Sequence, residues 1–113
     1  MIDKGIMGGS ATILVLSLLQ KREMYGYEIV QELAAQSDDT FHMQEGTLYP
    51  LLHSLENAGH ITSRVQIYNG RPRRYYHITE SGQVLLTEKL KQWETITNML
   101  QRLNTGTVIS EGV

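Results

Sequence analysis

The stretch VQIYNGRPRRYYHIT, Val65 to Thr79, decides the fold, because apolar and polar side chains alternate on both sides of a turn signal. The alternation begins at Ile61, and the segment NGRP supplies turn chemistry before a second strand returns to Ile78. Tyr76 and Ile78 should share the inner face of this hairpin. Pro72 cannot donate a backbone hydrogen bond, so we expect a tip loop somewhat longer than two residues.

Positive charge is concentrated in this hairpin, although the formal net charge of the chain is -2. Residues 57–79 contain four arginines and no acid, whereas residues 1–56 carry eight acids and three bases. A local positive field therefore survives on an acidic protein. The arginines either form a solvated hairpin tip or meet an anionic partner.

Three helical patterns precede the hairpin. Ser10 is the predicted N-cap of the first helix, whose apolar side chains recur at helical spacing from Ala11 to Leu19. The second helix follows the break at Tyr25-Gly26-Tyr27 and ends at QSDDT. The third carries leucines at 48, 51, 52 and 55, with Gly59 where a left-handed C-terminal cap is expected.

The start of the third helix has two interpretations. If Thr47 is the N-cap, Pro50 is the third helical residue, whose missing N–H would have no partner within the helix. If the helix begins nearer Gln44, Pro50 should bend it.

A final helix is predicted over residues 80–103, opened by Thr79 and Glu80. At 1.5 Å per residue it would be roughly 36 Å long, and its apolar seam extends beyond what a small domain needs. It either folds back on its own domain or pairs with a second copy, and we expect the second. The predicted dimer interface consists of Leu86, Leu90, Trp93, Ile96, Leu100 and Leu103.

The element order is that of a mainly α fold with a small β-hairpin, a winged helix-turn-helix followed by a long dimerisation helix. We expect a DNA-binding domain over residues 1–79, a dimerisation helix over 80–104 and a tail over 105–113. In this fold the third helix can enter a major groove while the wing arginines lie against phosphates. Double-stranded DNA is therefore the partner that explains the basic hairpin.

Three segments, YGYEIVQEL, EGTLYPLLHSLENAGHI and GRPRRYYHITESG, resemble the defining segments of the PadR family of bacterial transcriptional regulators. The resemblance extends from Met7 to about Leu103, and the single C-terminal helix resembles the short subgroup. It implies a homodimeric, ligand-responsive repressor of detoxification or efflux genes that binds an inverted-repeat operator. The alternative is a winged helix used for protein contact without DNA binding.

The DNA-contacting candidates follow from the residues and from this resemblance together. Tyr49 resembles the DNA-contacting tyrosine of the family, and its alternative role is a half-buried ring packed on the wing. Of Tyr25 and Tyr27, one should reach a phosphate and the other should fill the core, and we assign Tyr25 to the DNA. The full set is Tyr25, Thr47, Tyr49, His53, Ser54, Arg71, Arg73 and Arg74.

Trp93 is the single tryptophan and lies on the predicted dimer seam. Multidrug-binding members of the PadR family place a tryptophan at the corresponding point and stack flat aromatic ligands between its two copies. The resemblance thus implies a small aromatic effector, and Met7, Met99 or nearby leucines are candidates for the rest of its pocket. Plain packing of the dimer is the alternative.

The sequence contains no motif of an enzyme, a metal site or a membrane span. The chain has no cysteine, and its four histidines lack the spacing of a zinc protease, so we expect neither an enzyme nor a metal or cofactor site. The apolar run from Ala11 to Leu19 is too short to span a bilayer. We therefore expect a cytoplasmic protein with no membrane partner.

Overall fold

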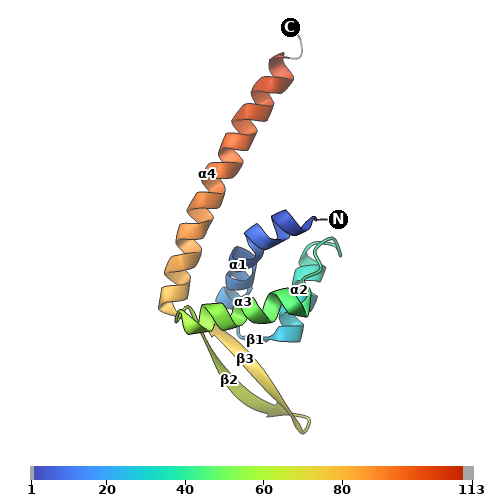
Figure 1. Cartoon of the computed structure of the whole chain (residues 1–113), viewed down its shortest axis with the longest axis vertical. Coiled ribbons are helices and arrows are strands. Elements are labelled where there is room, and N and C mark those ends of the chain that lie inside the picture. The colour runs from blue at the N-terminus through green and yellow to red at the C-terminus, as the bar shows by residue number, and fades with distance from the viewer. Residues whose placement is uncertain (1, 111–113) are drawn as a thin grey trace.

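The computed structural model of the chain describes residues 2–110. It confirms a winged helix-turn-helix with a long C-terminal helix (Figure 1). The three strands form one antiparallel sheet in the order β1-β3-β2. The elements are α1 (Lys4–Lys21), β1 (Met24–Tyr25), α2 (Gly26–Gln36), α3 (Glu45–Asn57), β2 (Ile61–Tyr68), β3 (Arg71–Ile78) and α4 (Glu80–Ser110).

A hydrophobic core lies between α1, α2, α3, the start of α4 and the base of the sheet. Its fully buried side chains include Leu16 and Leu19 of α1, Ile29 of α2 and Ile61 of β2. Tyr76 and Ile78 of β3 are buried as well, which confirms the inner face predicted for the hairpin. The helix pair α2–α3 and the base of the wing therefore share one core.

The first helix begins earlier than expected, so the assignment of Ser10 as its N-cap is wrong. Asp3 is the cap, because its carboxylate accepts a hydrogen bond from the backbone N–H of Ile6 at 3.0 Å. Ser10 lies inside the helix, where its hydroxyl donates to the Ile6 carbonyl at 2.8 Å. The intervening glycines are tolerated in the helix once its start is capped.

Helix α3 begins at Glu45 with Gln44 as its N-cap, which decides between the two predicted starts. Pro50 is thus an interior residue and removes the hydrogen bond that a residue there would donate to the Gly46 carbonyl. The other end is confirmed, since Gly59 has a φ of 82°. The N–H groups of Gly59 and His60 donate to the carbonyls of Glu56 and Leu55 at 3.0 and 2.9 Å, as in a Schellman cap.

The wing turns through two residues only, so the longer tip loop expected from Pro72 is wrong. Asn69 and Gly70 have φ angles of 51° and 76°, the pattern of a type I′ turn. Pro72 pairs with Ile67 in the strand register. This pair is the non-hydrogen-bonded one next to the pair that closes the turn, so the ladder needs no N–H from Pro72.

A network of side chains joins the end of α3 to the start of α4. The Thr79 hydroxyl caps α4 by accepting from the N–H of Gly82 at 3.1 Å and donates to the Gly59 carbonyl at 2.7 Å. His60 Nδ1 and Ser81 Oγ are hydrogen-bonded at 2.6 Å. These bonds therefore fix the start of α4 against the end of α3.

Helix α4 runs to Ser110, six residues beyond the predicted boundary at 104, so most of the expected tail is helical. Its first turns pack on α1, and the rest projects away from the domain on the side opposite the wing (Figure 1). The molecule is 67 Å long for this reason. Residues 111–113 of the expected tail lie outside the described residues.

Candidate nucleic-acid interface

The predicted contact residues of α3 all lie on its exposed side. Thr47, Tyr49, His53 and Ser54 are all exposed, whereas the leucines at 48, 52 and 55 face the core. Tyr49 and His53 are four residues apart and therefore neighbours on one face of the helix. A phenol, an imidazole and two hydroxyls can donate and accept hydrogen bonds at base edges or phosphates.

Tyr49 packs on the N-terminus of α2. A Cβ atom built at Gly26 would lie 2.5 Å from the Tyr49 hydroxyl oxygen, so this close approach requires glycine at position 26. The hydroxyl end of the ring thus packs against α2. The alternative role predicted from the sequence places the ring on the wing instead. With 39% of its surface exposed, Tyr49 links the two helices and still presents an edge to solvent.

Two tyrosines at the start of α2 differ from expectation. The sequence predicts Tyr27 in the core if Tyr25 faces DNA, but Tyr27 is 58% exposed. Tyr25 is half-buried, and its ring stacks on Tyr27 with centroids 6.5 Å apart and meets the edge of Tyr75 at 5.5 Å. Tyr25 therefore belongs to an aromatic cluster on the outer face of the sheet.

The three arginines of the tip have different surroundings. The Arg73 guanidinium lies between two rings, 4.5 Å from the centroid of Tyr25 and 4.4 Å from that of Tyr68. Hydrogen bonding to Tyr75 and the neighbouring phenols raise the pKa of Arg73. Sequence reasoning missed this cluster, because its members are diagonal neighbours across strands and become visible only with the register.

Arg74 points to the other face of the hairpin. Its Nη1 donates to the Ser63 hydroxyl at 3.0 Å, and that hydroxyl donates to the Glu56 carboxylate of α3 at 2.6 Å. Burial raises the pKa of the neighbouring Tyr76 phenol.

Arg71 differs from both other arginines of the tip. It is exposed, and within residues 2–110 its side chain makes no hydrogen bond, ion pair or ring contact.

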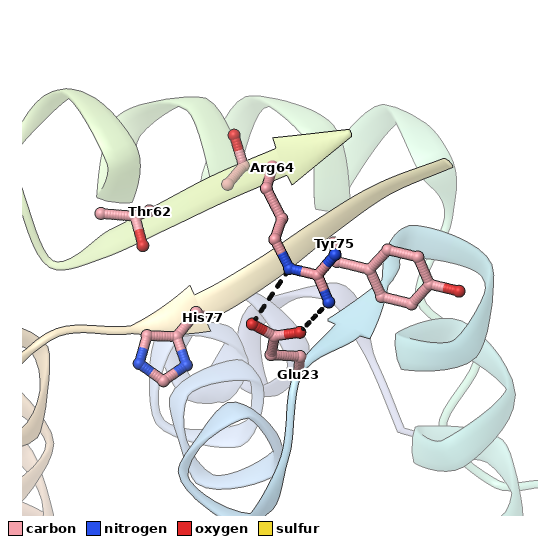
Figure 2. A pocket seen from close by; sticks show the side chains of 6 residues that line it. Glu23, Thr62, Arg64, Tyr75 and His77 are labelled. Carbon is pink, nitrogen blue, oxygen red and sulfur yellow. Dashed lines mark hydrogen bonds and ion pairs between the residues drawn. The ribbon is translucent and has the colours of Figure 1, made fainter. Parts of the chain in front are cut away.

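Nearer the base of the wing, Arg64 forms an ion pair with Glu23, as Figure 2 shows. Arg64 Nε and Nη2 donate to the two Glu23 carboxylate oxygens at 3.4 and 2.5 Å, and the guanidinium lies 5.2 Å from the Tyr75 ring centroid. The hydrogen bonds between the two side chains lower the pKa of Glu23 and raise the pKa of Arg64. Arg64 is thereby paired with a carboxylate of its own chain.

A second exposed surface follows α4. Leu86 is buried in the core of its own chain at 2% exposure, so we remove it from the predicted dimer interface. The remaining members are 41–61% exposed: Leu90, Trp93, Ile96, Leu100 and Leu103. Met99, at 45% exposure, continues the same apolar surface.

Trp93 borders a pocket of about 290 Å³ between α1, the end of α2 and α4. Its other lining residues come from Ile2 and α1, from the end of α2 and from the segment that follows α2: Ile2, Ile6, Ser10, Leu14, Leu33, Gln36, Ser37 and Phe41. Met7 and Met99, the other ligand candidates, are not among the residues around it, and Met7 packs against the core instead.

Neither a metal cluster nor a membrane span is found in the described part of the chain. Within residues 2–110, no three His, Asp or Glu side chains gather closely enough to hold a metal ion. No described helix is both long and apolar enough to cross a bilayer.

Comparisons with known proteins match this architecture. The model of the transcriptional regulator PadR-like family matches residues 15–88. The transcriptional regulator Rv3488 of Mycobacterium tuberculosis is 36% identical over 74 residues, covering 66% of each chain. A transcriptional regulator structure from Clostridium thermocellum has a TM-score of 0.82 at 29% identity, covering 88% of this chain and 97% of that one. A PadR family regulator from Eggerthella lenta has a TM-score of 0.78 at 32% identity, covering 88% and 85%.

Proposed function

This chain belongs to the PadR-like family of transcriptional regulators, and from that premise we propose that it is a homodimeric repressor of an inverted-repeat operator. The family consists of DNA-binding regulators rather than enzymes, which favours DNA binding over the protein-contact alternative. The observation that carries the proposal is the exposed polar face of α3 beside a basic, acid-free hairpin.

Each subunit would place α3 in a major groove and the wing beside it. Tyr49, His53, Thr47 and Ser54 would meet base edges and phosphates, because they cover the exposed face of the helix. The free guanidinium of Arg71 would contact phosphate, since no group of the described chain neutralises it. The Tyr25 ring is occupied by Arg73, so direct contact of Tyr25 with DNA is no longer part of the proposal.

The dimer would form through the exposed seam of α4. An apolar stripe that runs along a projecting helix remains in contact with water unless a second molecule covers it. A two-fold pair is the simplest closed arrangement, and it would present two recognition helices to two half-sites. This supports the homodimer and the inverted repeat together.

Effector response would use the pocket beside Trp93, with detoxification or efflux genes as targets. A planar aromatic compound would gain apolar burial against Ile6, Leu14 and Phe41 and stacking on Trp93. A tenfold drop in DNA affinity requires about 1.4 kcal/mol of preference for the non-binding geometry. Because Trp93 is the only tryptophan, its fluorescence reports binding without a contribution from a second indole.

Titration with planar cationic dyes and phenolic acids tests the effector. We expect quenching of Trp93 fluorescence in the wild type, weaker binding of the same compound to Trp93→Phe by calorimetry, and weaker operator binding in the presence of the compound. If no compound of these classes binds, Trp93 only packs the dimer.

Selection of genomic fragments followed by sequencing tests DNA binding itself. We expect enrichment of one inverted repeat, and the logarithm of its affinity should fall linearly with the logarithm of salt concentration by about 0.9 per phosphate contact. Recovery of no sequence, with binding that is insensitive to salt, would favour the protein-contact alternative.

A further inference from the structure

The outer half of the wing receives little support from the rest of the sheet. Strand β1 pairs with β3 only at Tyr75 and Tyr76, so the hairpin beyond these residues is a two-stranded ribbon. On the inner face of this ribbon Val65 and Ile67 are exposed and make no core. Two isolated strands are only marginally stable in water, so side-chain contacts must fix the direction of the tip.

Arg73 supplies such a contact on the outer face. Its guanidinium lies between the rings of Tyr68, next to the turn, and Tyr25, at the start of α2. The guanidinium carbon is 4.4 Å from the centroid of the Tyr68 ring and 4.5 Å from that of the Tyr25 ring. Tyr25 is itself held by strand pairing with Tyr75 and by the bond from its backbone N–H to Glu28 at 3.2 Å. The stacked column therefore connects the tip to the helix-turn-helix.

On the inner face Arg74 provides a second connection. Its bond to Ser63, and the bond of Ser63 to Glu56, link the hairpin to the last turns of α3. Arg71 shares the outer face and the strand with Arg73 but has no stacking partner in the described chain. Two of the three arginines are thus engaged within the molecule.

We propose that Arg73 is a positioning residue, which holds the wing at a fixed angle to α2 and α3 instead of clamping a phosphate. The spacing between the groove contact of α3 and the backbone contact of the tip then depends on the Tyr25–Arg73–Tyr68 stack. Arg74 supports the same geometry from the opposite face, and Arg71 remains as the phosphate contact. The part of this inference that concerns DNA rests on the proposed function.

Hydrogen exchange of the free protein tests the positioning role without DNA. Arg73→Met removes the planar cation, and Arg71→Met removes the same charge two residues away on the same face. We expect amide exchange in the outer hairpin to accelerate about tenfold in Arg73→Met, because no cation then stacks on the two rings, and to remain unchanged in Arg71→Met. Tyr68→Leu, which alters no charge, should reproduce part of the acceleration. Equal exchange in both methionine variants, or unaltered exchange in both, overturns the proposal.

Operator binding separates positioning from phosphate contact. Arg71→Met should flatten the slope of log affinity against log salt by about 0.9 for each phosphate that a subunit no longer binds. Arg73→Met should weaken operator binding about tenfold, but its change in salt slope should be less than half that of Arg71→Met. Adding Tyr68→Leu to Arg73→Met should weaken binding little further, because both substitutions remove the same stack. A slope change in Arg73→Met equal to that of Arg71→Met would make Arg73 a phosphate contact. Failure of the wild type to bind any duplex would refute the proposed function and leave the exchange result valid.

Discussion

Helices α3 and α4 both carry leucine-rich stripes, but within residues 2–110 only the stripe of α3 is largely buried. Leu48, Leu52 and Leu55 of α3 are 0–5% exposed, whereas Leu90, Leu100 and the other apolar residues of the α4 seam are 41–61% exposed. Periodicity alone does not distinguish these cases, because both helices repeat apolar residues at helical spacing. The difference lies in what stands opposite each helix.

The two stripes differ in what they support. The stripe of α3 packs the helix on the core and leaves its other side exposed, which is the side that the proposed function assigns to DNA. The stripe of α4 is buried only in its first turns, at Leu86, and its later members are 41–61% exposed. Burial within one chain supports folding, and exposure along a projecting helix supports assembly.

A charge in the α4 seam should have the largest effect. Leu100→Asp would bury a carboxylate from each subunit at the proposed interface, and we expect dimer affinity to fall by roughly 100-fold or more. Operator binding should disappear with it, because two half-sites are no longer held together. Light scattering measures the mass. Asn98→Asp adds the same charge on the other side of the helix and should leave the dimer intact; an unchanged mass in Leu100→Asp would refute the seam.

Truncation of a leucine inside the core should have the next largest effect. Leu52→Ala is expected to lower the free energy of unfolding by about 2–5 kcal/mol, because Leu52 is completely buried. In the monomeric Leu100→Asp background, Ile96→Ala should change it by less than about 0.5 kcal/mol, since Ile96 is half exposed. Urea denaturation gives both values. Similar costs at the two positions would remove the distinction between the stripes.

The joint between the two helices offers a third test. A Cβ atom at Gly82 would collide with the His60 carbonyl and lie 2.8 Å from Cγ1 of Ile78. Gly82→Ala should therefore destabilise the protein by about 1–3 kcal/mol and disturb the direction of α4 relative to α3. Gly8→Ala is the control, because nothing lies within 4 Å of its Cβ position and alanine favours a helix. Thermal melts in which both variants match the wild type would argue against a tight joint.

The smallest effect is expected at the base of the wing. The pKa of Glu23 is lowered in the folded protein from its ordinary value of 4.5, so its pairing with Arg64 stabilises the fold above that value and weakens as the pH falls through the folded pKa. Glu23→Gln should melt slightly below the wild type at pH 7, and the difference should shrink at pH 3. Because the ion pair is exposed, added salt should also reduce this difference in melting temperature. A difference that grows on acidification has the wrong sign for this account.

Several elements follow directly from local sequence patterns. The leucine spacing predicted α3, Gly59 predicted its C-terminal cap, and the period of two predicted the hairpin with Tyr76 and Ile78 inward. Each depends on residues close together in the chain, where propensity and periodicity act.

The errors and omissions depend on contacts or choices that spacing does not specify. Asp3 and Ser10 are both good caps, and the sequence alone does not rank them. Pro72 conflicts with a two-residue turn unless the register places it at a non-hydrogen-bonded position. The stack of Arg73 between Tyr25 and Tyr68 joins residues 48 and 5 positions away, and this clustering alters the role expected for an arginine in a basic tip.

The most direct test of the central claim, that α4 fixes two α3–wing units on one operator, is the dependence of affinity on half-site spacing. The selected inverted repeat is compared with a variant in which about five base pairs, half a helical turn, are inserted between the half-sites. We predict that the insertion lowers the affinity of the wild type to that for a single half-site. An affinity unchanged by the insertion would contradict the account.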